Sequence, residues 1–168
     1  MDYLQLASKS LADALAETLG SEGTEATHGQ SPLCIAAIVG FTGEHARGTL
    51  GVTADGAGLE RVLQHFGLDP ESDNADESIG ELGNLLLGHV KRCYGRHGLD
   101  IALSTPMVVR GLSIQVEGRQ DSLWVERAID DGTAHLVCWL DTQSEPEVEI
   151  PDEVVNSDIA DQGDALFF

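Results

Sequence analysis

The sequence has few basic residues. Nine Lys and Arg stand against 29 Asp and Glu in 168 residues, which gives a formal net charge of -20 at pH 7. A surface of that charge repels nucleic-acid phosphates and anionic lipid headgroups. We therefore expect neither nucleic acid nor a membrane surface as a partner. The acidity favours partners that expose Lys or Arg, although an acidic surface also serves solubility alone.

Cysteines and long apolar runs are scarce as well. Cys34, Cys93 and Cys138 are odd in number, far apart and set in apolar stretches, so we expect reduced, buried thiols. The chain has no run of about 18 apolar residues that could span a membrane. It also lacks the basic start and unbroken apolar run of a secretory signal. We expect a soluble, cytoplasmic protein.

The length suits one domain, which we place at residues 1–142. Apolar spacing predicts helices at about 2–19, 55–67 and 77–97, with Asp55 capping the second and Gly98 ending the third. Predicted strands lie at about 33–41, 49–53, 99–104, 107–109, 112–116, 123–129 and 134–140. Hairpin turns dominate, so the predicted fold class is α+β, an antiparallel-rich sheet with helices packed on one face.

The chain from Asp141 onward holds nine acids and no Lys or Arg. This composition predicts an acidic, mobile tail over residues 143–168.

The third predicted helix has two unlike faces at 100° per residue. Its apolar stripe, which we expect to face the core, holds Ile79, Leu82, Leu86, Val90, Cys93 and His97, flanked by Leu87 and Tyr94. The opposite face is polar and rich in glycine, and holds Glu77, Gly80, Glu81, Asn84, Gly88, Lys91, Arg92 and Gly95. Each interior glycine costs about 1 kcal/mol relative to Ala. Tight helix packing would explain the glycines, and so would a partner backbone that approaches Glu81 and Asn84 closely.

Glu81 and Asn84 are three residues apart, so both side chains project from one side of the helix. The bare spacing is common, because Glu71 and Asn74 repeat it in the acidic loop before the helix. Taken alone, it indicates two polar residues on a wet face.

The context of this pair resembles the CheX branch of the CheC-like chemotaxis phosphatases. The run Ser-Ile-Gly-Glu-Leu-Gly-Asn-Leu-Leu-Leu-Gly at 78–88 is followed at 103–111 by Leu-Ser-Thr-Pro-Met-Val-Val-Arg-Gly. The resemblance covers about 33–111 and continues more weakly to 140. Glu77 stands where the family pattern has Asp or Ser, and the interval to Pro106 is about one residue shorter. CheC itself resembles a duplicated arrangement, so the single helix here is more similar to CheX.

The resemblance implies a phosphatase that hydrolyses the aspartyl phosphate of a CheY-like response regulator, and that pairs as a homodimer. It implies that Asn84 positions the attacking water and that Glu81 docks to the lysine of the receiver. Contacts to the receiver are expected at Glu77, Gly80, Leu85 and Gly88. No cofactor or metal is expected from this chain, because the receiver carries its own Mg²⁺.

Two other functions stay open. A CheX-like domain could bind a receiver or a flagellar-switch component without catalysis. His89, Cys93 and His97 recur every four residues, as in a metal site, but they would need further ligands from elsewhere. We expect Trp124 and Trp139 to serve in core or interface packing.

Two features outside the third predicted helix allow further predictions. The run at 133–140 should form an exposed sheet edge that a homodimer buries. The ending Asp164-Ala165-Leu166-Phe167-Phe168 resembles the carboxy-terminal peptide by which CheZ phosphatases bind the same receiver. Leu166, Phe167 and Phe168 are therefore candidate receiver contacts, and a purely solubilising tail is the alternative.

Overall fold

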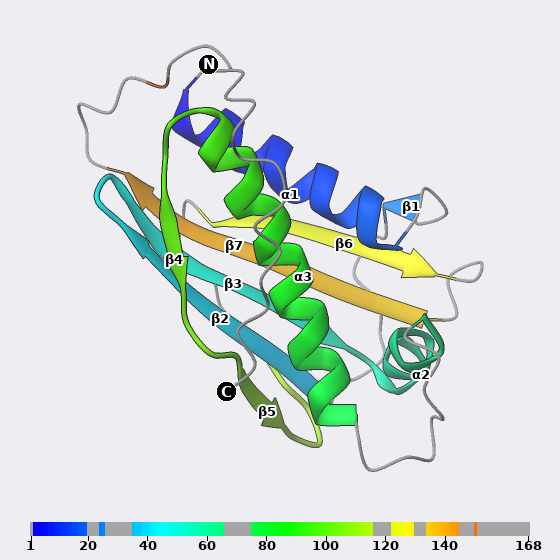
Figure 1. Ribbon diagram of the computed structural model, residues 1–168. Coiled ribbons are helices and arrows are strands. Elements are labelled where there is room, and N and C mark those ends of the chain that lie inside the picture. The colour runs from blue at the N-terminus through cyan, green and yellow to red at the C-terminus, as the bar shows by residue number, and fades with distance from the viewer. Residues whose placement is uncertain are drawn as a thin grey trace.

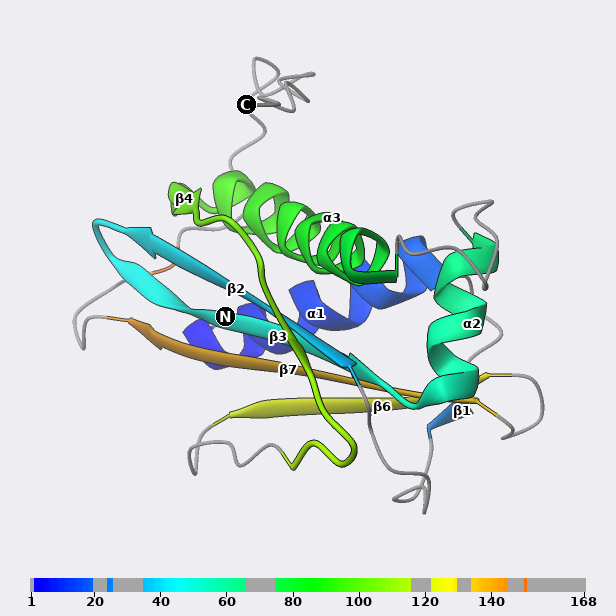
Figure 2. The same cartoon turned by 90° about the horizontal axis from the view of Figure 1, so that it is seen from below.

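A single antiparallel sheet frames the protein in the computed structural model, which describes residues 2–19, 24–25, 35–65, 75–115, 122–129, 134–144 and 150. Helices α1 and α3 lie on one face of this sheet, and α2 lies at one end (Figures 1 and 2). The elements are α1 (Tyr3–Leu19), β1 (Thr24–Glu25), β2 (Ile35–Gly43), β3 (Ala46–Ala54), α2 (Gly56–His65), α3 (Ala75–Arg96), β4 (Ile101–Leu103), β5 (Met107–Arg110), β6 (Leu123–Ile129) and β7 (Ala134–Ser144). The predicted α+β class is confirmed.

The strand order is β1-β6-β7-β3-β2-β4, and β5 also pairs with β2. Every pair is antiparallel, with β4 on the second half of β2 and β5 on its first half. The prediction that the run at 133–140 forms an edge is wrong. Strand β7 is interior, because β3 pairs with it on one side and β6 on the other.

The helix ends follow from local side chains. Asp2 and Gln5 cap α1 reciprocally: Asp2 Oδ1 accepts from the Gln5 N–H at 2.8 Å, and Gln5 Oε1 accepts from the Asp2 N–H at 3.1 Å. Asp55 caps α2 as predicted, with the Gly58 N–H donating to its Oδ1 at 2.6 Å. Gly98 ends α3 in the left-handed region, at φ 74°.

The core lies between the sheet and the two long helices. Along α3, Ile79, Leu82, Leu86, Leu87, Val90 and Tyr94 are fully buried. Cys93 and His97 are only half-buried, so the buried stripe is rotated toward Leu87 and Tyr94 relative to the prediction. Of the thiols expected to be buried and reduced, Cys138 is a buried free cysteine and Cys93 a half-buried one, whereas Cys34 lies outside the described residues.

A buried chain of hydroxyl groups joins α3, α1 and β7. The Tyr94 hydroxyl donates to the Tyr3 hydroxyl at 3.3 Å, and Tyr3 is hydrogen-bonded in turn to Thr142 Oγ1. The ring of Tyr94 also packs edge-on against Tyr3 and Phe41. Burial raises the pKa of Tyr94 far above its usual range, so the group remains a neutral donor.

Other boundaries differ from the prediction as well. Residues 111–115 form no strand, and Leu112 is 98% exposed, because nothing in this part of the described chain pairs with it. Strand β7 continues to Ser144, two residues into the predicted tail. Helix α3 begins at Ala75, so Asp76 belongs to the helix instead of the acidic loop.

The remaining expectations fall partly outside the structure. Residues 66–67 at the end of the second predicted helix and residues 151–168 of the predicted tail lie outside the described residues. Ile150 is described and packs partly buried against the core. Within the described ranges, no helix is both long and apolar enough to cross a membrane.

The two tryptophans pack on each other on the face of the sheet away from the helices. Trp124 and Trp139 stand opposite each other on β6 and β7 and stack at 5.8 Å between ring centroids, 26° apart. Gly51 of β3 lies opposite Trp139, and a Cβ built there would overlap the indole ring. The missing side chain therefore makes room for Trp139 to lie across β3.

Replacing Gly51 with Ala should displace the Trp139 ring and lower the free energy of unfolding by about 1–3 kcal/mol, the usual cost of overpacking. Thermal or urea unfolding measures the change. Gly56→Ala is the matched control, because a Cβ there meets nothing within 4 Å. Equal stability of the two variants would show that the Trp139 ring can move without cost.

Candidate active site on helix α3

Helix α3 rests on the sheet through Gly83. A Cβ at this position would lie 3.1 Å from Val39 Cγ2 and 3.5 Å from Ala37 Cβ, so glycine allows the helix backbone to lie close to β2. The side of the helix that faces away from the sheet carries the predicted catalytic pair. Glu81 is exposed there, and Asn84 is half-buried.

The polar groups of Glu81 and Asn84 are available to a partner. Neither side chain makes a hydrogen bond or ion pair with any residue that the structure describes. Glu77 is exposed one turn earlier, and Leu85 beside Asn84 is 39% exposed although it is apolar. The structure thus brings Glu77, Glu81, Asn84 and Leu85 together on one outward side of one rigid element.

The two glycines predicted to lie on this face have different surroundings. Gly80 is buried: a Cβ there would lie 3.6 Å from Val108 Cγ2 and 3.7 Å from Pro106 Cβ. Its predicted place on the open face is therefore wrong, because the chain's own Pro106 and Val108 cover it. Gly88 is half-exposed, and among the described residues only Arg92 Nη1, at 3.9 Å, lies near the Cβ position. Gly88 leaves the helix backbone open to an approaching partner.

The Ser-Thr-Pro segment at 104–106, whose Pro106 covers Gly80, is held to β2 by two hydrogen bonds. The Ser104 N–H donates to the Gly40 carbonyl at 2.9 Å, and the Gly40 N–H donates to Ser104 Oγ at 2.9 Å. At the end of β5, the Arg110 guanidinium forms an ion pair with Asp76 in the first turn of α3. This pair was not predictable from the sequence, since opposite charges 34 residues apart give no local signal.

The alternative metal site has no support in the geometry. His89 Nδ1 lies 2.9 Å from Glu17 Oε2 on α1, so this ring already has a carboxylate partner. Burial and the nearby Arg92 lower the pKa of His89, and the opposing effect of Glu17 is smaller. Across the described ranges, no group of three or more His, Cys, Asp or Glu side chains is placed to hold a metal ion.

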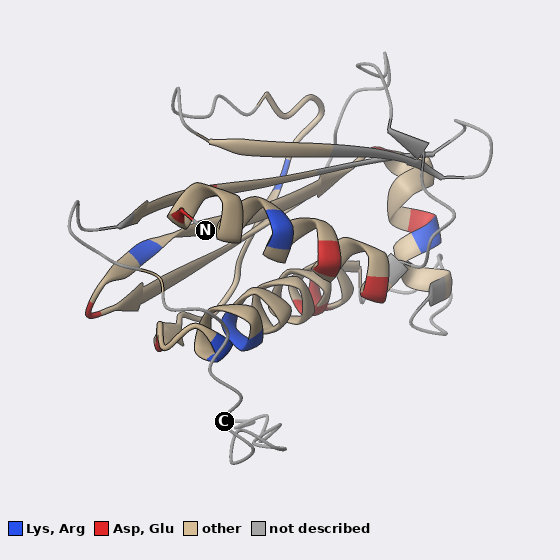
Figure 3. Cartoon of the chain, turned by 90° about the horizontal axis from the view of Figure 1, so that it is seen from above, with Lys and Arg blue, Asp and Glu red and all other residues tan. Residues whose placement is uncertain are grey.

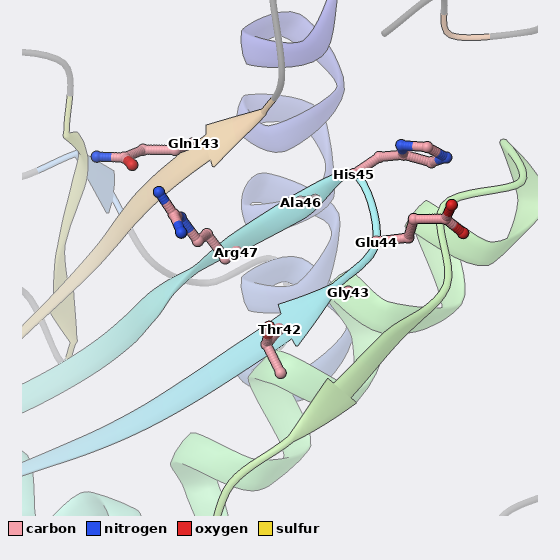
Figure 4. A pocket seen from close by; sticks show the side chains of 7 residues that line it. All are labelled: Thr42, Gly43, Glu44, His45, Ala46, Arg47 and Gln143. Atoms are coloured by element: carbon pink, nitrogen blue, oxygen red, sulfur yellow. The ribbon is translucent and has the colours of Figure 1, made fainter.

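A cavity of about 230 Å³ lies at the β2-β3 hairpin, and neither Glu81 nor Asn84 lines it. It is lined by Thr42, Gly43, Glu44, His45, Ala46, Arg47 and Gln143 (Figure 4). Glu44 and His45 extend away from Arg47 and Gln143, so the polar side chains do not converge on one point. This cavity offers no catalytic arrangement.

Known structures share this fold. A CheC-like protein of Shewanella oneidensis matches with a TM-score of 0.65 at 17% identity, covering 83% of this chain and 96% of its own. CheX of Vibrio vulnificus gives 0.65 at 20% identity, covering 85% and 97%. A Borrelia burgdorferi structure, a complex of CheX with CheY, BeF₃ and Mg²⁺, gives 0.62 at 18% identity, covering 85% and 99%. No curated protein matches significantly in sequence.

The family model described as chemotaxis phosphatase CheX matches residues 35–126. The match begins at β2 and ends within β6, so it includes all of α3 and the Ser-Thr-Pro segment. The chain belongs to the CheX family of chemotaxis phosphatases.

Proposed function

We propose that this protein accelerates hydrolysis of the aspartyl phosphate on a CheY-like receiver in the cytoplasm, with Asn84 positioning the water and Glu81 docking to the receiver lysine. The proposal rests on the arrangement of Glu81 and Asn84. Both side chains project outward from a helix packed on the sheet, and neither is engaged by the described part of the chain. Membership of the CheX family and the CheX–CheY complex of a structural relative support the same partner.

The chemistry requires little from this chain. The receiver supplies the phosphorylated Asp, a Mg²⁺ ion and a Lys around the phosphoryl oxygens. A water oxygen attacks phosphorus, the bond from phosphorus to the Asp carboxylate oxygen breaks, and inorganic phosphate leaves. Phosphoryl transfer depends mainly on alignment and charge stabilisation. The Asn84 amide offers a donor and an acceptor that can hold this water in line.

Glu81 has a docking role in this mechanism. Its carboxylate pairs with the receiver lysine and fixes the register of the two proteins, so that Asn84 reaches the phosphoryl group. A general base is not required, because the metaphosphate-like transition state gains little from early removal of the water proton. No metal ligand is required from this chain either. Glu77, Leu85 and Gly88 complete the contact around the pair.

A panel of purified phosphorylated receivers tests the function. Each is timed for decay with and without this protein, and at least one should lose its phosphoryl group faster with it. A receiver that binds without faster decay would favour the alternative, a non-catalytic module that binds a receiver or a flagellar-switch component.

We also propose a homodimer. Among the described strands, β4 and β5 form the sheet edge on the β2 side, and this edge exposes the apolar side chains of Leu103, Met107 and Val109. An edge of this kind is commonly covered by a second copy. Light scattering should return twice the chain mass of 17.9 kDa at micromolar concentration. A monomer mass across that range would contradict the proposal.

The carboxy-terminal residues Leu166, Phe167 and Phe168 are proposed as a tethered receiver contact. Ile150 packs partly buried against the core, and 18 residues follow it in the sequence. A flexible linker of that length has an end-to-end distance of roughly 20–25 Å. Such a tether raises the local concentration of receiver near α3.

Truncation after Asp152 should therefore raise the KM for phosphorylated receiver and leave kcat unchanged. Initial rates over a range of receiver concentrations separate the two constants. Equal rates of the full and truncated chains at low receiver concentration would leave the tail with a solubility role only.

A further inference from the structure

The charged residues on the outward side of α3 are acidic in the first half of the helix and basic in the second half. Glu77 and Glu81 are exposed in its first half, and Lys91 and Arg92 are exposed in its second half. Figure 3 shows acidic segments toward the start of this helix and basic segments toward its end. With 1.5 Å rise per residue, Lys91 lies about 15 Å along the axis from Glu81. At 100° per residue, both share the side that carries Asn84 and Gly88.

Stabilisation of the helix does not explain Lys91 and Arg92. Favourable interaction with the helix dipole is confined to the last turn, and Arg96 is the basic residue of that turn. Arg92 Nη2 is 3.9 Å from Glu17 Oε1, a long and largely exposed pair of low value. Lys91 forms no ion pair with any described residue.

Three basic residues, Lys91, Arg92 and Arg96, lie at this end of the helix, with Glu17 on α1 and Asp100 after the helix as neighbouring acids. Glu17 is the carboxylate that faces it from α1, and it is shared between Arg92 and His89. Burial and Arg92 lower the pKa of His89, which favours its neutral form. Three of the chain's nine Lys and Arg therefore lie within six residues, on a protein with a net charge of -20.

We infer that Lys91 and Arg92 form a second contact for the receiver, and that the receiver carries a carboxylate cluster about 15 Å from the lysine that meets Glu81. The inference rests on the proposed function and deepens it. A receiver that docks in this direction along α3 pairs opposite charges at both ends, whereas the reversed direction places like charges together. The acidic surface elsewhere repels such a carboxylate cluster and guides it to this end of the helix.

The test uses Lys91→Glu in the full chain, with a receiver that the panel of phosphorylated receivers shows to be a substrate. Lys9 is an exposed lysine on α1, and Lys9→Glu is the matched control because it changes the net charge by the same amount. At about 50 mM salt, Lys91→Glu should raise KM about fivefold and leave kcat unchanged, and the difference should shrink near 500 mM as salt screens the contact. Lys9→Glu should change KM less than about twofold.

The outcomes separate the two proposals. If no receiver loses its phosphoryl group faster with the unmodified protein, the proposed function fails. If dephosphorylation is accelerated but Lys91→Glu and Lys9→Glu have equal KM values, the function stands and the second contact is wrong. If Lys91→Glu and the truncation after Asp152 both lower KM, the cations bind the chain's own acidic tail, which also overturns the inference.

Discussion

Asn84→Ala is expected to lower the rate of receiver dephosphorylation by about 10²-fold or more, since a misplaced attacking group costs this much. Affinity for the receiver should be nearly unchanged, because one amide contributes little docking area. Decay of phosphorylated receiver under single-turnover conditions measures the first quantity. Titration of a receiver loaded with BeF₃ and Mg²⁺ measures the second.

Loss of activity in Asn84→Ala cannot come from unfolding. The Asn84 side chain makes no hydrogen bond with the described residues, and Ala is the better helix former by several tenths of a kcal/mol. The variant should therefore be at least as stable as the parent. Asn84→Asp is a useful companion, because it keeps the shape of the side chain and removes the amide donor. Near-normal turnover in both variants would contradict the proposed role of the amide.

Glu81→Ala should weaken receiver binding by about 2–5 kcal/mol, the usual cost of removing one partner of a desolvated ion pair. This corresponds to an increase in Kd from about 30-fold upward. Glu81→Gln should have a smaller effect, because the amide still accepts a hydrogen bond from the lysine. The free carboxylate is exposed and unengaged in the described structure, so neither change should lower the free energy of unfolding.

Glu77→Ala is the comparison for Glu81→Ala, because Glu77 lies at the edge of the proposed contact and should contribute less to binding than Glu81. Glu77 is an exposed acid on the same helix, one turn before Glu81. If long-range attraction between an acidic helix and a basic receiver were the whole effect, both variants would weaken binding equally and salt would abolish the difference. Unchanged affinity in Glu81→Ala would move the docking role to Glu77 or Leu85.

Periodicity was sufficient to predict the third helix and its outward side, whereas the catalytic role proposed for that side came from the resemblance to CheX. The apolar stripe fixes which way a helix faces, so the residue spacing places Glu81 and Asn84 opposite the core. Gly80 could not be placed in this way. A helical wheel gives direction relative to the core, and Pro106 and Val108 cover Gly80 from a segment more than 25 residues later.

The order of the strands was not predictable from the sequence. The run at 133–140 is apolar enough for an edge strand that pairs in a dimer, and equally for an interior strand. Its interior place results from pairing with β3, which is distant in sequence, and with β6. Residues 112–116 show the opposite case. Their alternation is typical of a strand, yet residues 111–115 have no partner strand among the described residues.

Helix α3 is held at three separated points: the Asp76–Arg110 ion pair at its start, Gly83 against β2, and the Tyr94 hydroxyl chain near its end. A surface fixed in this way loses little conformational entropy when a partner arrives. The heat-capacity change of docking to α3 should then scale with contact area alone, without a contribution from coupled folding. We therefore expect rigid-body docking at α3, in which the backbone of this helix moves little on binding.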